Sequence, residues 1–152
     1  MRHLLLLIPG ALLLSTLSLR AADPVTEITI TTDKTQFIYD IKEFTVKAGT
    51  KVKITLVAPQ GAIPQPHNLV IIKPGKDAAV IQGAMGMMAD PQGLAKGYVP
   101  ESQDVVAHTK LINPGETDVL EVEIPAVAGD YPYLCTFPGH FAIMKGVMKV
   151  IE

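Results

Sequence analysis

The chain has 152 residues, of which 48% are hydrophobic and 18% are charged, and it contains 12 Gly, 12 Pro, one Cys and no Trp. This composition fits one globular domain with an additional segment, and it excludes a disordered, collagen-like or coiled-coil protein. The formal charge is only −2. Because no stripe of Lys or Arg is present to bind phosphates, nucleic acid is not expected as a partner.

The N-terminus has the pattern of a secretory signal peptide. Arg2 precedes an apolar run at residues 4–14, and the small residues Ala21 and Ala22 follow. The run has about 11 residues, whereas a membrane-spanning helix needs about 20, so a membrane anchor is the less favoured alternative. We therefore expect residues 1–21 to be a signal peptide, cleaved after Ala21 or Ala22. The protein is then exported, with the periplasm as the favoured compartment, and has no membrane span.

The mature chain, residues 22–152, is expected to form a single domain. With Arg2 and Arg20 removed, the 13 basic residues fall to 11 against 15 acidic residues, a formal charge of −4. A chain of this size builds a core without disulfides, and the single Cys135 cannot form one internally. Because a free thiol outside the cytoplasm is open to oxidation, we expect something to occupy this sulfur.

Short segments of strand character follow one another along the mature chain, separated by turns rich in Gly, Pro and Asn. The predicted strands lie at residues 25–32, 44–46, 52–57, 69–72, 105–112, 119–124, 131–135 and 146–151. Alternating short strands with this spacing predict an all-β protein, a Greek-key β-sandwich of about eight strands.

One insertion breaks the strand pattern, at residues 77–88. Ile81, Met85 and Met88 recur there at i, i+4 and i+7, which predicts a short helix with these three on one face. The methionines Met85, Met87 and Met88 have two interpretations. Either they pack on the core and form an apolar rim, or they offer a transient soft-ligand docking site for copper.

Four residues have side chains that suit a soft metal ion. Cys135, His140 and Met144 follow the spacing Cys-x4-His-x3-Met in one loop between two predicted strands, and His67 stands at the start of another strand. A thiolate, two imidazoles and a thioether suit copper, with three strong ligands in a plane and a weak axial Met. Zinc fits less well, because thioether is not among its usual ligands.

Each of these residues also has an ordinary interpretation. Met144 and Cys135 taken singly are typical core residues, and the histidines taken singly are typical polar residues at strand ends. The coincidence of all four favours copper. A Cys-His nucleophile would need a third residue to orient the base, and none is evident, so we do not expect an enzyme. His108 is interpreted as a surface histidine.

The loop with these ligands resembles that of a known family. The run CTFPGH at residues 135–140, followed by Met144, is similar to the ligand loop of azurins, which are bacterial blue copper proteins of the cupredoxin family. The resemblance continues through residues 106–112, the helical insertion and His67-Asn68, so it covers most of residues 25–152. It implies an eight-stranded Greek-key sandwich with one type 1 copper near one end.

The resemblance also implies a role for each matching residue. His67, Cys135 and His140 would be the equatorial ligands and Met144 the long axial ligand. The Asn68 side chain would tie the His67 strand to the backbone near Thr136. The N–H groups of Asn68 and Phe137 would point at the Cys135 sulfur and raise the potential.

The sequence departs from azurins at several positions. Pro66 stands where azurins usually have Gly, so its carbonyl is the candidate for a weak axial contact opposite Met144. The azurin disulfide has no counterpart. The resemblance implies that the ring edge of His140 faces solvent, with an apolar docking patch around it. We assign this patch to Pro138, Gly139, Phe141, Ala142 and Met87, with Pro66 beside it.

Together these features predict an exported type 1 blue copper protein that carries single electrons by cycling between Cu(II) and Cu(I). Its partner would be a redox protein such as a c-type cytochrome or an oxidoreductase, and the protein would be a monomer. The alternative is an exported copper-binding carrier or scavenger that uses the same ligands without redox turnover. A fast reversible redox couple favours the first, and ready transfer of copper to an apo-acceptor favours the second.

Overall fold

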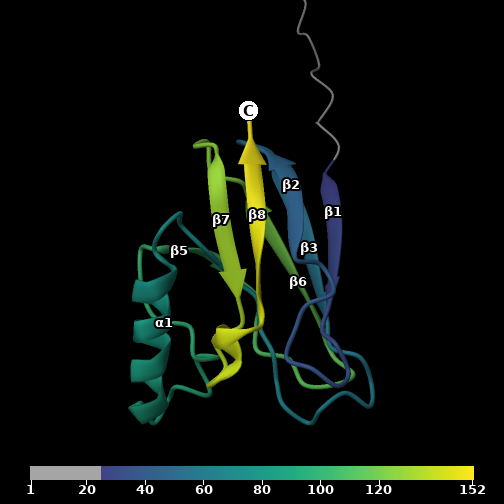
Figure 1. Cartoon of the computed structure of the whole chain (residues 1–152), viewed down its shortest axis with the longest axis vertical. Coiled ribbons are helices and arrows are strands. Elements are labelled where there is room, and N and C mark those ends of the chain that lie inside the picture. The colour runs from purple at the N-terminus through teal and green to yellow at the C-terminus, as the bar shows by residue number, and fades with distance from the viewer. Residues whose placement is uncertain (1–24) are drawn as a thin grey trace, which may run out of the picture.

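The computed structural model describes residues 25–152, so the predicted signal peptide and its cleavage site lie outside the described residues. Eight strands form two sheets (Figure 1). The strands are β1 (Thr26–Thr31), β2 (Glu43–Lys47), β3 (Lys51–Val57), β4 (Val70–Ile72), β5 (Val105–His108), β6 (Thr117–Glu123), β7 (Gly129–Leu134) and β8 (Lys145–Ile151). One sheet has the order β1-β3-β6 and the other β2-β8-β7-β4-β5. The prediction of an all-β sandwich of about eight strands is confirmed.

The two sheets enclose one main core because alternate residues of each strand point inward. In β3, for example, Val52, Ile54 and Leu56 are buried while the residues between them are not. Tyr39 and Tyr133 add aromatic bulk, with their ring centroids 5.6 Å apart. The same cluster of buried residues includes Cys135 and Met144, so the ligand loop is anchored in the main core.

The predicted strand at 105–112 is shorter in the structure, where β5 ends at His108. The backbone N–H of Lys110 donates to the carboxylate of Asp118 at 2.8 Å instead of continuing the sheet. Pairing resumes at Ile112, which forms an isolated bridge with His67. This bridge fixes the backbone of one of the expected metal ligands.

The predicted helix exists, but Met85 and Met88 do not lie on its buried face. The helix α1 spans Asp77–Gly86 and continues as a 3₁₀ turn, η1, at Met87–Ala89. Its buried residues are Val80 and Ala84, whereas Met85 and Met88 are 52% and 58% exposed. Core packing of these two methionines is therefore excluded.

The buried face of α1 is set by a close approach that periodicity does not reveal. A Cβ added to Gly83 would lie 2.9 Å from the Cβ of Pro100, so only glycine allows this contact without a shift. The helix packs on a second apolar cluster, beside the five-stranded sheet (Figure 1). The cluster consists of Val70, Ile72, Val80, Val99 and Leu134. Within residues 25–152, no helix is both long enough and apolar enough to cross a membrane.

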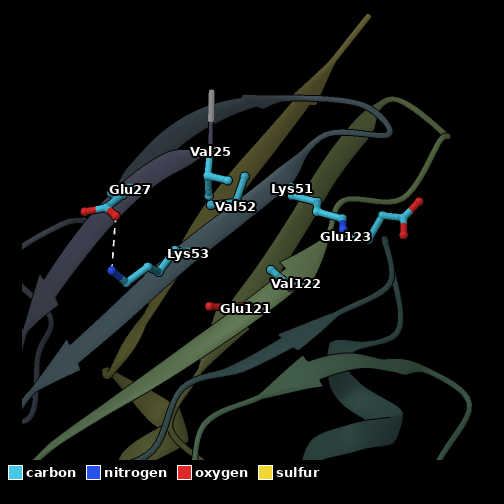
Figure 2. Close-up of a pocket in the computed structure, with 8 residues that line it drawn as sticks. All are labelled: Val25, Glu27, Lys51, Val52, Lys53, Glu121, Val122 and Glu123. Carbon is cyan, nitrogen blue, oxygen red and sulfur yellow. Dashed lines mark hydrogen bonds and ion pairs between the residues drawn. The ribbon is translucent and has the colours of Figure 1, made fainter. Parts of the chain in front are cut away.

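The three-stranded sheet has a charged outer face. Figure 2 shows a hollow at one end of it, where Glu27 of β1 pairs with Lys53 of β3 at 3.1 Å. Glu121 and Glu123 of β6 lie opposite Lys53 and Lys51 in the register. This hollow is at the end where β1 begins, far from the ligand loop that follows β7 (Figure 1). Acidic and basic residues thus stand opposite each other on neighbouring strands, a pattern that suits a sheet face in contact with water.

Candidate metal centre

Three of the four predicted ligands come together in the structure. One donor atom each from His67, Cys135 and His140 lies within 4.8 Å of the other two. The side chains are buried, at 1%, 0% and 2% exposure. His67 precedes β4, Cys135 follows β7, and His140 begins the 3₁₀ turn η2 (His140–Ala142). Because β4 and β7 are neighbouring antiparallel strands, their ends bring His67 beside the loop of Cys135 and His140.

The loop between β7 and β8 is folded by its own hydrogen bonds. Gly139 takes a left-handed conformation, with φ of 85°, which most other residues avoid. The His140 N–H then donates to the carbonyl of Phe137 at 3.0 Å, and the Met144 N–H donates to the carbonyl of His140 at 2.8 Å. The Cys135 N–H donates to the Met144 carbonyl at 3.0 Å, so the fully buried Met144 lies next to the cysteine.

Asn68 joins the two halves of the site. Its side-chain oxygen accepts a hydrogen bond from the Thr136 N–H at 2.9 Å, and its amide group donates to the Thr136 hydroxyl and the Gly97 carbonyl, each at 2.8 Å. The three bonds are buried and fix the strand of His67 relative to that of Cys135. Tyr39 adds a further bond from its hydroxyl to the Asn68 carbonyl.

The surroundings of Cys135 act on its thiol in two opposite ways. Burial raises the pKa of Cys135 to about 12, while the N–H groups of Asn68 and Phe137, which point at the sulfur, lower it in part. In the metal-free protein the thiol is therefore protonated at neutral pH, and the two N–H groups are already placed to stabilise a thiolate. A metal ion must displace that proton to bind.

The two histidines are neutral at pH 7. Burial lowers the pKa of His67, and burial followed by the charge of His67 lowers the pKa of His140 to about 4. The His67 Nδ1 is buried with no hydrogen-bond partner among the described residues. The His140 Nδ1 lies 3.6 Å from the Cys135 Sγ. A buried nitrogen without a hydrogen-bond partner and a nearby imidazole and thiol form a donor set that suits a soft metal, so the residues fit such an ion.

The outer edge of His140 is covered, contrary to the expectation that it faces solvent. The ring is only 2% exposed, because its Nε2 is 2.7 Å from the Gln65 Oε1 and the Phe37 ring stacks on it with centroids 4.2 Å apart. Sequence reasoning missed both covering residues. Gln65 stands in a Pro-Gln-Pro run directly before His67, and Phe37 is an aromatic residue following a polar turn; these were the available signals.

The other residues singled out in the sequence lie as follows. His108 is exposed at the end of β5, with its Nδ1 2.9 Å from the Thr109 carbonyl, so it is the surface histidine that was expected.

The residues assigned to the docking patch differ in exposure. Gly139 and Ala142 are exposed, whereas Pro138, Phe141 and Met87 are half-buried. Phe141 packs against the second apolar cluster, the one that α1 covers, which places that helix next to the ligand loop. Pro66 is half-buried beside His67.

The fold and the donor set of residues 25–152 define a β-sandwich metalloprotein with a buried site for a soft metal ion at one end of the sandwich. Residues 26–151 match the family described as copper binding proteins, plastocyanin/azurin family. The chain therefore belongs to this family, as an azurin-like blue copper protein with a cupredoxin fold, and its cofactor is copper.

Individual proteins of known sequence and structure agree. The chain is 39% identical to Azurin-1 of Alcaligenes xylosoxydans xylosoxydans, over 75% of this chain and 89% of that protein. It is 34% identical to Auracyanin-A of Chloroflexus aurantiacus, over 84% of this chain and 75% of that protein. The crystal structure of dithionite-reduced auracyanin from Roseiflexus castenholzii superposes with a TM-score of 0.72 at 35% identity, covering 86% of this chain and all of that one.

Proposed function

We propose that the protein is an exported carrier of single electrons whose one copper ion is held by His67, Cys135, His140 and Met144. The observation that carries the proposal is the buried group of two imidazoles and one thiol with donor atoms within 4.8 Å of one another. Copper bound there supplies a one-electron couple between Cu(II) and Cu(I). The two imidazoles and the thiolate would be the strong ligands of the ion, and the buried Met144 thioether would be the weak ligand.

The protein's own contribution is a site that changes little on reduction. Cu(II) favours tetragonal geometry and Cu(I) favours fewer ligands. The bonds from Asn68 to Thr136 and Gly97, and those within the ligand loop, hold the donor groups in one arrangement for both states. The Pro66 carbonyl, directly before His67, would be the candidate for a further weak contact with the ion. The N–H groups of Asn68 and Phe137 withdraw charge from the thiolate and thereby raise the potential.

Partners would meet the protein at the end where the ligand loop lies. The docking patch is formed by Pro138, Gly139, Phe141, Ala142 and Met87, and no charged residue occurs between Leu134 and Met144. A small apolar contact suits a carrier that must dissociate quickly. The partner proposed is a redox protein such as a c-type cytochrome or an oxidoreductase, met by a monomer in the periplasm after removal of residues 1–21.

Addition of Cu(II) to the metal-free protein tests the ligand set. We expect an intense blue colour from charge transfer between Cys135 and Cu(II), which disappears on reduction. Cys135→Ser should abolish the colour even where copper still binds, and His108→Ala, which changes an exposed histidine, should leave the colour intact. A wild-type protein that binds copper and stays pale would contradict the proposal.

The competing function is a copper carrier or scavenger without redox turnover. It uses the same ligands, so the spectrum does not separate it from the electron carrier. Voltammetry and measurements of copper transfer distinguish the two functions. A reversible couple with retention of copper in the presence of an apo-acceptor supports electron transport, whereas rapid loss of copper to the acceptor supports the scavenger.

A further inference from the structure

We propose that Gln65 is a positioning residue for His140, and that together with Phe37 it forms a cover that replaces water at the outer edge of this ligand. The inference rests on the proposed function in so far as His140 is a copper ligand. It departs from a site in which the imidazole edge is open to solvent. We call the side chains of Gln65 and Phe37 the cover.

The hydrogen bond to Gln65 fixes which nitrogen of His140 carries the proton. An amide oxygen only accepts, so the Nε2–H donates to the Gln65 Oε1 at 2.7 Å and the lone pair of the ring is on Nδ1. This lone pair faces the Cys135 Sγ, at 3.6 Å. The opposite amide orientation would require a proton on Nδ1 and would leave no nitrogen free for a metal. Gln65 therefore selects the tautomer that a copper ligand needs.

Aromatic rings close the faces of the same imidazole. Phe37 lies nearly parallel to it, with centroids 4.2 Å apart and an interplanar angle of 20°. Phe137 approaches within 4.8 Å at 50°, and His67 within 5.0 Å at 35°. These ring contacts and the hydrogen bond from Nε2 to Gln65 leave His140 only 2% exposed. They also prevent its ring from turning.

The two parts of the cover belong to segments that are bonded to each other. The Ile63 N–H donates to the Lys34 carbonyl at 3.0 Å, which joins the loop before His67 to the loop that carries Phe37. The Gln65 N–H donates to the Ile63 carbonyl at 2.7 Å. Pro64 and Pro66 restrict the backbone on either side of Gln65. The backbone that carries the Gln65 side chain is thus restricted before any metal binds, which favours one placement of its amide against His140.

An acceptor on the distal N–H makes an imidazole a better electron donor to its metal. A stronger donor stabilises Cu(II) relative to Cu(I), so the Gln65 bond should lower the redox potential. Gln65→Leu, which keeps the bulk but removes the acceptor, should raise it. Gln65→Ala admits water as a substitute acceptor and should raise it less, and Gln65→Glu, a stronger acceptor with a negative charge, should lower it.

Hydrogen exchange of the His140 Nε2–H, followed by NMR, tests the cover without any redox reaction. It is measured on the metal-free protein and on the diamagnetic Cu(I) protein. Wild type should exchange slowly. Gln65→Ala should exchange about tenfold faster or more, because the N–H is then open to water. Gln65→Glu keeps an acceptor and should remain protected. Gln103→Ala, a change at an exposed glutamine, is the matched control and should behave as wild type.

Two results would overturn the inference. One is exchange in wild type as fast as in Gln65→Ala, which would mean that no cover exists. The other is a potential of Gln65→Leu at or below that of wild type, which would mean that the bond does not act on the metal. Failure of the proposed function looks different: the protein would lack a reversible copper couple, while slow Nε2–H exchange in the metal-free protein would still report the cover.

Discussion

Asn68 and Thr136 bond to each other twice across the metal centre, with the Thr136 N–H donating to the Asn68 Oδ1 at 2.9 Å and the Asn68 Nδ2 donating to the Thr136 Oγ1 at 2.8 Å. One residue follows His67 and the other follows Cys135. The pair therefore sets the separation of two proposed ligands that are far apart in the sequence, and it lies fully buried.

Asn68→Ala should destabilise the protein strongly. The substitution leaves the buried Thr136 N–H and the Gly97 carbonyl without this partner, and each such group costs about 1–3 kcal/mol. We expect the free energy of unfolding of the metal-free protein to fall by roughly 2–4 kcal/mol in urea titrations. The copper protein should also show a shifted potential, because the two ligand strands are no longer held together.

Asn113→Ala is the matched control for this prediction. Asn113 is exposed, and its side chain bonds only to Glu116 at 3.2 Å. Its effect should stay within about 0.5 kcal/mol. Equal losses for the two variants would mean that the Asn68 bonds contribute nothing specific to the metal centre.

The sequence was sufficient to predict the strands and to single out the three side chains that the structure brings together, His67, Cys135 and His140, because local patterns mark them. Strands such as β3 show the alternation of a half-buried sheet, and the run from Cys135 to Met144 places a thiol, an imidazole and a thioether in one short loop, a soft donor set that suits copper. The prediction that His67 lies beside this loop came from its position at the start of a neighbouring strand. The resemblance to azurins supplied the roles of Asn68 and Phe137, which residue type alone does not indicate.

These local patterns did not predict contacts between segments that are distant in the sequence. The buried face of α1 is decided by the approach of Pro100 to Gly83, not by the spacing of Met85 and Met88. In a helix with apolar residues on all sides, periodicity does not define one face. Gln65 and His140 are 75 residues apart, so nothing in the local sequence of either indicates their bond.

The metal-free protein should be most stable between about pH 6.5 and pH 9 as judged from its buried groups. The pKa of His140 falls from 6.5 to about 4 on folding, so below pH 6.5 the unfolded chain binds more protons and stability declines as the pH is lowered towards 4. The pKa of Cys135 rises from 9.0 to about 12, so above pH 9 the unfolded chain loses its proton first and stability declines again. Urea unfolding at pH values from 4 to 12 measures both declines in stability, the acid limb below pH 6.5 and the alkaline limb above pH 9.

Substitutions separate the two limbs of this profile. His140→Gln should reduce the acid limb, to which the buried His67 also contributes because burial lowers its pKa. Cys135→Ser should reduce the alkaline limb at its onset above pH 9, whereas Tyr39 and Tyr133, whose pKa values are raised by burial, contribute only above about pH 10. Asp33 and Asp90, whose pKa values are lowered by hydrogen bonds, contribute only below about pH 4 and do not obscure the acid limb. Constant stability from pH 7 to pH 4 would show that His140 is not buried as a neutral group.

Copper binding should release about one proton per ion at pH 7, because the Cys135 thiol is protonated in the metal-free protein and both ligand histidines are neutral. The apparent affinity should accordingly rise about tenfold per pH unit around neutrality. Calorimetric titration with Cu(II) in two buffers of different ionisation enthalpy counts the protons. No proton release would indicate a thiolate already present without metal, in conflict with the burial of the sulfur.

Met144 should tune the potential through the axial position. A thioether favours Cu(I) and an oxygen donor favours Cu(II), so Met144→Gln should lower the potential and Met144→Leu, which removes the donor, should raise it. Voltammetry of the two variants measures this. The other fully buried methionine on the strand that follows, Met148, provides the control, since Met148→Leu changes the core without changing a proposed ligand. Identical redox potentials for the two Met144 variants would show that Met144 is not a copper ligand.

The docking patch should make electron exchange depend on apolar contact and little on salt. Ala142 is exposed beside His140, and the loop from Leu134 to Met144 contains no charge. Burial of the patch contributes at most about 25 cal/mol per Å², which leaves a weak contact after the entropy of association is subtracted. Because no charges lie close to the contact, screening by salt should change the rate of electron exchange little.

Self-exchange rates across ionic strength test this expectation. Ala142→Glu and Phe141→Asp should slow exchange while leaving the blue spectrum nearly unchanged, because neither side chain is a ligand. Ala142→Glu is the cleaner of the two, since Phe141 also packs against the second apolar cluster. Val127→Asp is the matched control: Val127 is 70% exposed in the turn before β7, at the opposite end of the sandwich from the ligand loop (Figure 1). A wild-type rate that depends steeply on salt, together with equal effects of Ala142→Glu and Val127→Asp, would place the docking surface away from His140.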